Sequence, residues 1–376
     1  MNPFTPTFGV SPAFVLGRET IVQGFSQGLA GGVGDPRRTL LISGPRGIGK
    51  TITLNELEDA AAEQGWIVLR AHPHDLLAPL VDTAIPHALS LLKQHDSGHR
   101  RIASISVAGV GAIATERTED AQPAPSIISS LNTLCDALGE HSGVVLTLDE
   151  VQSAQPKQLW ELSSAIQDLR RDNRQIAFAA AGLPDGIWKL LKHPGTTFLR
   201  RAQHVSLAPM TPGDTIEIFR STALEGEITF SDDAVEAAAA LTRGYPFLIQ
   251  LLGFHLVEEA RARNATQVEA SDVSAVSETV LNTLGQLVHG PALHDVPQSQ
   301  LDYLHAMAKL QDGSSPVSTG EIAEHLGKRP QELTMARQGL IQRELIYSPR
   351  RGYVNFIIPH MSHHLLRGGV RQTGWD

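Results

Sequence analysis

Short apolar runs alternate with longer amphipathic stretches through the first half of the chain. The runs Thr39–Ser43, Gly65–Arg70, Gly143–Leu148 and Gln175–Gly182 predict strands, and the stretches between them repeat apolar residues at helical spacing. Strands that are apolar on both faces are typical of a parallel sheet covered by helices. The pattern therefore predicts an α/β fold in which a parallel sheet lies between helices.

The second half of the chain changes to a mainly helical pattern. Thr211 and Ser231 each precede an apolar periodic run, as N-cap residues do. We therefore expect residues 211–290 to form helices. The hydrophobic pattern sets this region apart from the α/β region before it.

Residues 298–366 have the pattern of a winged helix. Leu301–Leu310 predicts a first helix, and Ser318–Leu326 resembles the capped start of a helix-turn-helix. Arg329–Glu344 then predicts a recognition helix, and residues 345–357 predict the hairpin wing. A winged helix either contacts DNA or packs against protein, and the pattern leaves both roles open.

A phosphate-binding loop follows the first predicted strand and opens a predicted helix. Its sequence fits G-x-x-x-x-G-K-[ST] at every fixed position, through Gly44, Pro45, Arg46, Gly47, Ile48, Gly49, Lys50 and Thr51. Backbone N–H groups of such a loop, and the helix dipole behind it, bind phosphate. We expect Lys50 to reach the β- and γ-phosphates of ATP and Thr51 to ligate Mg²⁺.

Two carboxylates end the strand Gly143–Leu148. Asp149 and Glu150 lie at the carboxyl end of a predicted parallel strand, where open α/β sheets bind their ligands. This resembles a Walker B motif. We expect Asp149 to hold Mg²⁺ through water and Glu150 to act as the catalytic carboxylate that orients and polarises water.

Composition narrows the class of protein. The 376 residues carry a formal charge of −9, so the surface is not broadly basic as in proteins coated for nucleic acid. From residue 301 onward the net charge is +2, which places any DNA contact in the winged helix. The single cysteine, Cys135, suits a reducing cytoplasm. We find no signal peptide and no apolar run of membrane-spanning length.

Further motifs resemble two ATPase families. Phe14–Glu19 is similar to the h-h-G-R-E entry motif of the signal-transduction ATPases with numerous domains (STAND) and of initiator-like (Orc1/Cdc6-type) AAA+ ATPases. In those families the segment with Gly17 and Arg18 lies beside the adenine. Arg243–Leu248 resembles the G-x-P motif of the STAND lid, which implies that Pro246 touches the nucleotide.

The chain also departs from these families. The predicted strand Gln175–Gly182 ends in Ala181-Gly182, where AAA+ proteins usually carry a polar sensor residue. Phe247 stands where initiator-like relatives carry a sensor arginine, and Arg243 is the nearby residue that could replace it. Arg200 and Arg201 lie where an arginine finger would reach a neighbouring subunit, with a solvated basic pair as the alternative.

The resemblance implies a domain order and an activity. The expected divisions are an N-terminal arm (1–13), an AAA+ domain (14–208), a helical lid (209–292) and a winged helix (293–376). The leading hypothesis is a switch that binds ATP or ADP with Mg²⁺, hydrolyses ATP slowly or when a partner stimulates it, and forms a homo-oligomer in its ATP state. A DNA-binding initiator or loader, and a nucleotide-bound structural module without turnover, are the alternatives.

Two segments are interpreted from composition. Gly28–Pro36 is rich in glycine and predicts a flexible linker. Residues 101–117 alternate Ile, Val, Ala and Ser around glycines and predict a surface hairpin or mobile loop, with a membrane-touching loop as the alternative. The histidines show no metal-ligand spacing.

Overall fold

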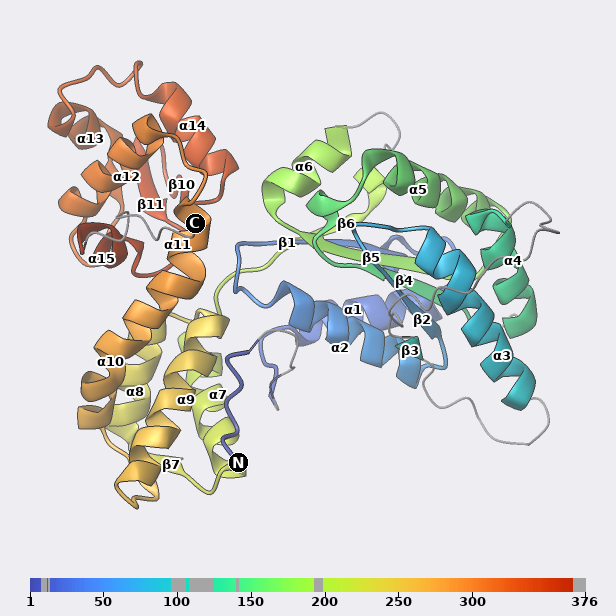
Figure 1. Cartoon of the computed structure of the whole chain (residues 1–376), viewed down its shortest axis with the longest axis horizontal. Helices are drawn as coiled ribbons and strands as arrows, with labels where there is room; N and C mark the ends of the chain where they lie inside the picture. Colours follow the sequence, from blue (N-terminus) through green and yellow to red (C-terminus); the bar gives the residue numbers. More distant parts are fainter. Residues whose placement is uncertain are drawn as a thin grey trace, which may run out of the picture. The chain divides into compact units, whose positions relative to one another are not determined.

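The computed structural model describes residues 1–7, 12, 14–95, 106–107, 125–139, 142–192 and 199–367. By their contacts the residues form two compact units, whose elements are labelled in Figure 1. The sheet unit comprises Arg18–Gly44 and Lys50–Leu207. The C-terminal unit comprises Met1–Gly17, Pro45–Gly49 and Ala208–Asp376. The domain boundaries expected at residues 208 and 292 stay predictions.

The sheet unit is built on a six-stranded sheet with the order β3-β2-β4-β5-β1-β6. All of its neighbouring strands run parallel, which confirms the predicted sheet. Its strands are β1 (Thr39–Ser43), β2 (Ile67–Ala71), β3 (Ser106–Val107), β4 (Val144–Leu148), β5 (Ile176–Gly182) and β6 (Gln203–Ser206). Strand β5 separates β1 from β4, so its carboxyl end lies between the phosphate-loop strand and the strand that precedes the two acidic residues.

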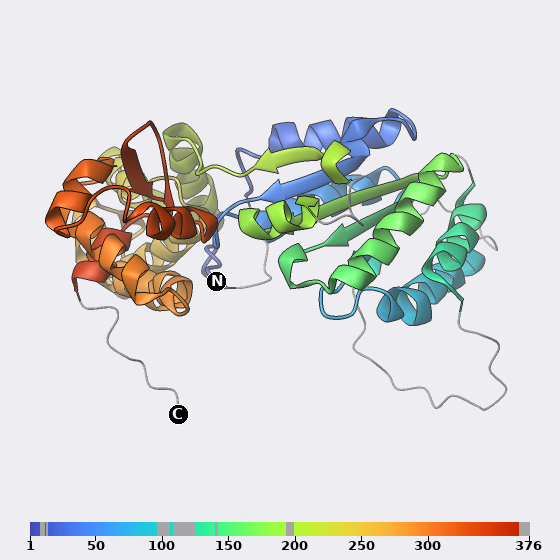
Figure 2. The same cartoon turned by 90° about the horizontal axis from the view of Figure 1, so that it is seen from above.

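Helices cover both faces of this sheet (Figure 2). On one face lie α1 (Glu19–Ala30) and α2 (Lys50–Glu63), and on the other lie α3 (Ile85–His95), α4 (Ile127–Leu138), α5 (Pro156–Arg171) and α6 (Pro184–Lys192). Short helical turns are η1 (Pro36–Arg38), η2 (Leu80–Ala84) and η3 (Val151–Ser153). Successive side chains of each strand enter opposite layers, so β1, β4 and β5 are buried on both faces.

Two sequence interpretations change in the sheet unit. Gly28 is not part of a flexible linker: it lies inside α1, where an added Cβ would stand 2.7 Å from Cβ of Arg37. Most of residues 101–117 lies outside the described residues. The described pair Ser106–Val107 aligns in parallel with β2, so this part extends the main sheet.

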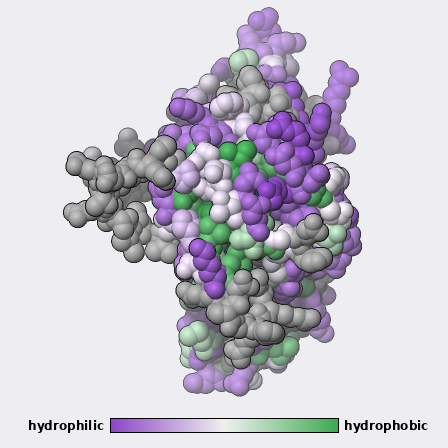
Figure 3. All heavy atoms as spheres, turned by 90° about the vertical axis from the view of Figure 1, so that its right-hand side faces the viewer, coloured by the Kyte–Doolittle hydropathy of each residue, from purple (hydrophilic) through white to green (hydrophobic). Residues whose placement is uncertain are grey.

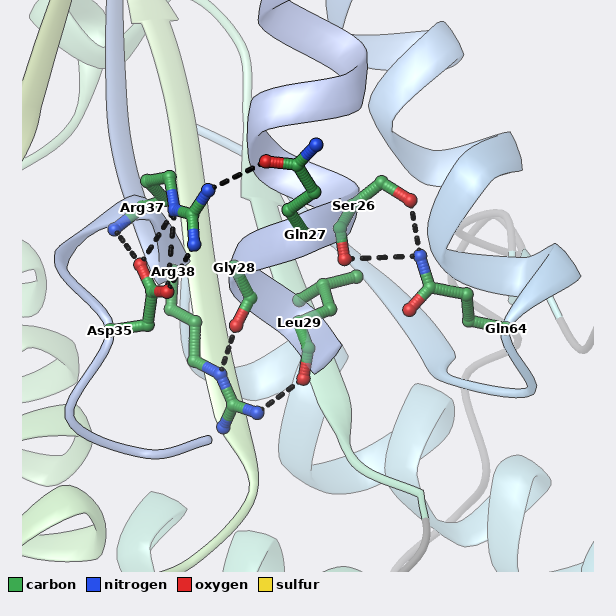
Figure 4. A network of polar contacts seen from close by, with 8 residues as sticks. All are labelled: Ser26, Gln27, Gly28, Leu29, Asp35, Arg37, Arg38 and Gln64. Carbon is green, nitrogen blue, oxygen red and sulfur yellow. Dashed lines mark hydrogen bonds and ion pairs between the residues drawn. The ribbon is translucent and has the colours of Figure 1, made fainter. Parts of the chain in front are cut away.

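A buried guanidinium joins the end of α1 to the start of β1. Arg38 is 1% exposed, and its Nε donates to the carbonyl of Gly28 at 2.8 Å while Nη2 donates to that of Leu29 (Figure 4). The guanidinium also lies over the Trp66 ring and donates to Gln175. Since the last carbonyls of a helix have no partner inside it, the cation satisfies them and complements the helix dipole.

The C-terminal unit begins with a helical region. It contains α7 (Pro212–Glu225), α8 (Asp232–Thr242), α9 (Pro246–Ala262), α10 (Ala270–Leu284), η5 (Gly285–His289) and α11 (Gly290–Leu293). Thr211 and Ser231 cap α7 and α8 as predicted, each accepting a backbone N–H three residues on. The pattern did not indicate the short parallel pair β7 (Thr229–Phe230) and β8 (Gln267–Val268).

A small helix-and-hairpin region ends the chain. Its elements are α12 (Gln298–Leu310), β9 (Val317–Ser318), α13 (Thr319–His325), α14 (Thr334–Gln342), β10 (Ile346–Tyr347), β11 (Tyr353–Phe356) and α15 (Met361–Leu366). The three strands form an antiparallel sheet in the order β10-β11-β9, as a winged helix requires. The expected recognition helix is shorter than predicted, because residues 330–333 form turns before α14 begins.

The first residues of the chain pack within the C-terminal unit. Phe4 is 1% exposed and lies 6.0 Å, ring to ring, from Phe219. Gly253 on α9 leaves the space for this ring, because an added Cβ would overlap Phe4. The backbone of this segment is also hydrogen-bonded to α9, because the Thr5 N–H donates to Oε1 of Gln250 at 3.0 Å. The first seven residues of the expected N-terminal arm thus form neither helix nor strand and pack against the helical region.

The surface carries both polar and apolar atoms. The face in Figure 3 is mostly hydrophilic, with apolar atoms gathered among the polar ones. Within the described part of the chain, no helix is both long and apolar enough to cross a bilayer.

We expect Arg38→Met to lower the free energy of unfolding by about 3 kcal/mol, because buried helix carbonyls lose a charged donor. Chemical denaturation would measure the loss. Arg37→Met is the matched control, since Arg37 pairs with Asp35 near the surface, and it should cost far less. Equal losses for the two variants would show that the buried guanidinium is not what holds α1 to β1.

Candidate functional site

Lys50 begins α2 at the carboxyl end of the phosphate loop. Its side chain is buried, with 6% of its surface exposed, and its Nζ donates to the carbonyl of Gly44 at 2.9 Å. The ammonium therefore lies against the first residue of the loop to which it belongs. From there it can meet phosphate oxygens as a point charge.

Thr51 and Asp149 come together although 98 positions separate them. The Thr51 hydroxyl donates to Oδ2 of Asp149 at 2.5 Å, and this pair is open to solvent. A hydroxyl and a carboxylate at this separation are hard oxygen donors of the kind that Mg²⁺ prefers. The two residues predicted to hold the metal thus fit it, and the cation would offset phosphate charge there.

Glu150 follows in a conformation that few side-chain-bearing residues adopt. Its backbone is left-handed, with φ 49° and ψ 44°, and its N–H donates to Oδ1 of Asp149 at 2.8 Å. Such a conformation costs free energy and persists where the surroundings enforce it. It turns the chain from β4 into η3 and leaves the Glu150 side chain exposed.

Gln152 is a residue that the sequence patterns missed. Its amide Nε2 donates to Oε2 of Glu150, and its Oε1 accepts the Leu183 N–H at 3.0 Å. The side chain therefore connects the second acidic residue to the residue that follows β5. The sequence gives only an indirect sign of this role: β5 ends in glycine, at the position where the sequence analysis expected the polar sensor residue of AAA+ proteins.

A second unpredicted network supports the strands beneath the site. Glu58, on α2, is 4% exposed and accepts the Thr147 hydroxyl at 2.6 Å and Nε of Arg70 at 2.6 Å. It ties the phosphate-loop helix to β4 and β2. Burial of a carboxylate is tolerated here because both of its oxygens are paired.

The middle of the phosphate loop, Pro45–Gly49, belongs by its contacts to the C-terminal unit. The Tyr245 hydroxyl donates to the carbonyl of Arg46, and the Phe247 N–H donates to that of Gly47 at 3.2 Å. Gly47 has φ +76°, and an added Cβ would stand 3.1 Å from the Tyr245 ring. Burial raises the pKa of Tyr245, and the nearby Glu344 adds to the rise.

The other residues expected to contact the nucleotide lie at helix ends. Arg18 is the N-cap of α1 and is 8% exposed, while Gly17 has φ +73° beside Asp214. Arg243 ends α8 in a left-handed conformation, and burial lowers the pKa of its guanidinium. Pro246 is the first residue of α9, where a missing N–H costs nothing. Their contacts with a nucleotide stay predictions.

The two finger candidates are both exposed. Nε of Arg200 donates to the carbonyl of Leu191 at 2.7 Å, which engages the guanidinium with the end of α6. Arg201 is exposed on the following turn. A role for either residue at a neighbouring subunit stays a prediction.

Two histidines of the C-terminal unit make structural contacts. Nε2 of His289 lies 2.9 Å from the Pro359 carbonyl, and Nε2 of His360 lies 2.7 Å from that of Leu241. Burial lowers the pKa of His289 to about 3. Across the described residues, no group of three or more His, Cys, Asp or Glu side chains could hold a metal ion.

Comparison with protein families separates two parts of the chain. Residues 15–178 match the model of the AAA ATPase domain. Residues 286–365 match a family described as a domain of unknown function (DUF8462). No curated protein matches the chain in sequence.

Solved structures share the fold of the whole chain. A Walker-type ATPase of Pyrococcus abyssi is 16% identical with a TM-score of 0.66, over 94% of this chain and 96% of that one. The ORC2 protein of Aeropyrum pernix, solved in ADPNP and ADP complexes, is 15% identical with a TM-score of 0.60, over 96% of both chains. The AAA ATPase domain thus lies in a chain with the P-loop fold of initiator-like ATPases.

We expect Lys50→Ala to weaken ATP binding roughly a hundredfold, because the phosphates lose a charge-assisted hydrogen bond. Calorimetric titration with ATP and Mg²⁺ would measure it. Lys157→Ala, which removes an exposed lysine from α5, is the control and should bind as the wild type does. Wild-type affinity in a folded Lys50→Ala variant would exclude this role for the lysine.

Proposed function

We propose that this protein is a cytoplasmic molecular switch that binds ATP with Mg²⁺ and hydrolyses it slowly. The support for nucleotide binding is the placement of Lys50 against its loop and the contact between Thr51 and Asp149. The fold shared with the nucleotide-bound ORC2 protein agrees with this. Thr51 and Asp149 would hold Mg²⁺, and the loop N–H groups would bind the phosphates.

The switch is proposed because hydrogen bonds attach the phosphate loop to the residues at the start of α9. Tyr245 and Phe247 donate hydrogen bonds to successive loop carbonyls, those of Arg46 and Gly47. Phosphates bind through the N–H groups of the same peptide units. A change in loop conformation on nucleotide binding therefore acts directly on the residues that begin α9.

Glu150 is proposed as the catalytic carboxylate. It would accept a proton from water as the water oxygen bonds to the γ-phosphorus and the bond to the ADP oxygen breaks. If the protein forms homo-oligomers when ATP is bound, Arg200 or Arg201 would act as an arginine finger at the nucleotide site of a neighbouring subunit.

DNA binding is the second candidate, favoured by exposed arginines at the end of the predicted recognition helix and in the wing. Arg343, Arg350 and Arg351 are exposed and enter no ion pair among the described residues. Arg350 lies over the Tyr353 ring at 3.9 Å, which holds it at the hairpin. Guanidinium groups held in this way could contact phosphates of a duplex.

We expect Tyr245→Phe to uncouple the loop from α9. In the wild type, ATP should change hydrogen exchange both in residues 45–49 and near the start of α9. In the variant, ATP should still bind within a fewfold of wild-type affinity, but its effect on α9 should be lost.

The matched control for this variant is Tyr303→Phe. Tyr303 is also buried in the C-terminal unit, and its hydroxyl has no hydrogen-bond partner among the described residues. It should retain the full response to ATP. A wild-type exchange response in Tyr245→Phe would remove the support for the switch, and a wild type that binds no ATP would exclude the function altogether.

We expect the double variant Arg350→Ala/Arg351→Ala to weaken binding to any duplex. It should also flatten the plot of log affinity against log salt, making its negative slope smaller in magnitude by up to about two units. Binding measured at several salt concentrations would show both effects. Lys157→Ala/Arg171→Ala removes two exposed charges elsewhere and should change neither. A wild type without affinity for duplex DNA at low salt would exclude DNA binding.

A further inference from the structure

The carboxyl end of β5 lies at the centre of the proposed site. In the sheet, Gly182 pairs with Ser43 of β1, while Ala180 pairs with Leu148 of β4. A polar side chain at position 182 would therefore reach the space between the phosphate loop and Glu150. The chain has a glycine there, so this position offers no side chain to the reaction.

The side chain of Gln152 fills the space that this glycine leaves. A Cβ added to Gly182 would stand 2.6 Å from Oε1 of Gln152 and 2.7 Å from Cγ1 of Val151, and one added to Gly186 would overlap the Gln152 side chain. Neither glycine is among those with positive φ. Room for Gln152, shared at Gly182 with Val151, rather than backbone conformation, is thus what favours glycine at these positions.

The surroundings also fix which way the amide of Gln152 points. The Leu183 N–H can only donate, so the oxygen Oε1 must face it, at 3.0 Å. Nε2 must then face Glu150, where it donates to Oε2 of the carboxylate. One end of the amide is anchored on the backbone after β5, and the other holds one carboxylate oxygen and leaves Oε1 of Glu150 to accept from water.

We propose that Gln152 is the positioning residue for Glu150 and replaces, from the following turn, the polar side chain that β5 lacks. This inference rests on the proposed function, in which Glu150 orients the attacking water. Gln152 acts through Glu150 and does not itself meet the nucleotide. It holds a carboxylate whose backbone is already constrained in the left-handed region, so that its free oxygen has a defined direction.

The sharpest variant is Gln152→Glu, which keeps the shape and the acceptor for the Leu183 N–H but replaces the donor by a carboxylate oxygen. Two carboxylates then face each other and repel, so the Glu150 carboxylate is no longer held in place. ATP affinity should stay within about twofold of wild type. Single-turnover hydrolysis at neutral pH should slow roughly tenfold to a hundredfold.

Gln158→Glu is a matched control in the same unit. Gln158 is also half-buried, and its amide also bridges a backbone N–H and a carboxylate, those of Leu76 at 3.0 Å and Asp75 at 3.1 Å. The substitution introduces the same charge repulsion away from the proposed site. It should lower stability as Gln152→Glu does, but leave the rate unchanged.

A second variant, Gln152→Met, serves if Gln152→Glu does not fold. It keeps the side-chain length and removes both the donor to Glu150 and the acceptor for the Leu183 N–H without adding charge, so hydrolysis should slow while ATP affinity stays close to that of the wild type. A wild-type rate, or a faster rate, in either folded variant would overturn the inference, because a residue that restrains Glu150 from acting would give the faster rate.

Glu150→Gln separates this inference from the proposed function. If Glu150→Gln hydrolyses ATP at the wild-type rate, the catalytic role of Glu150 fails. If Glu150→Gln is inactive but Gln152→Glu and Gln152→Met are not impaired, only the role of Gln152 fails. Should the wild type show no hydrolysis, NMR of the Gln152 side-chain amide decides: amide proton signals that Glu150→Gln leaves unchanged would refute the contact, and shifted signals would support it.

Discussion

The contact between Thr51 and Asp149 depends on the order of strands in the sheet. Because β5 lies between β1 and β4, the phosphate loop and the acidic pair reach the same edge with one strand between them. Thr51 lies in the first turn of α2 on one side, and Asp149 directly follows β4 on the other, so hydroxyl and carboxylate meet at 2.5 Å. Every proposed role of the site, from holding Mg²⁺ to orienting water, relies on this contact between the phosphate-loop helix and the end of β4.

Buried polar side chains keep these elements in register. Glu58 ties α2 to β2 and β4, and Arg38 fixes the end of α1 to the start of β1. Each is almost wholly buried, and each has its charge met by several hydrogen bonds, which is the condition under which burial of a charge is tolerated. The loop itself has further partners in Tyr245 and Phe247, so the stretch of backbone proposed to bind phosphates is also hydrogen-bonded to the residues at the start of α9.

Much of the fold followed from local patterns. The apolar runs predicted the buried strands, Thr211 and Ser231 predicted helix starts, and the glycines with Lys50 predicted the loop, because these features depend on neighbours in sequence. Errors arose where the local pattern was ambiguous. Glycine-rich composition indicated a flexible linker at Gly28, yet that glycine is needed for close packing inside α1.

The sequence by itself determined the parallel sheet between helices, the chemistry of the loop and the acidic pair that follows β4. Only the tertiary structure decided which distant side chains support them. Gln152 beside Leu183, Tyr245 on the loop and Phe4 on α9 are each set by packing between segments far apart in sequence. A single sequence does not show which of these distant residues touch, because side-chain contacts across a core depend on how the elements pack and not on residue spacing along the chain.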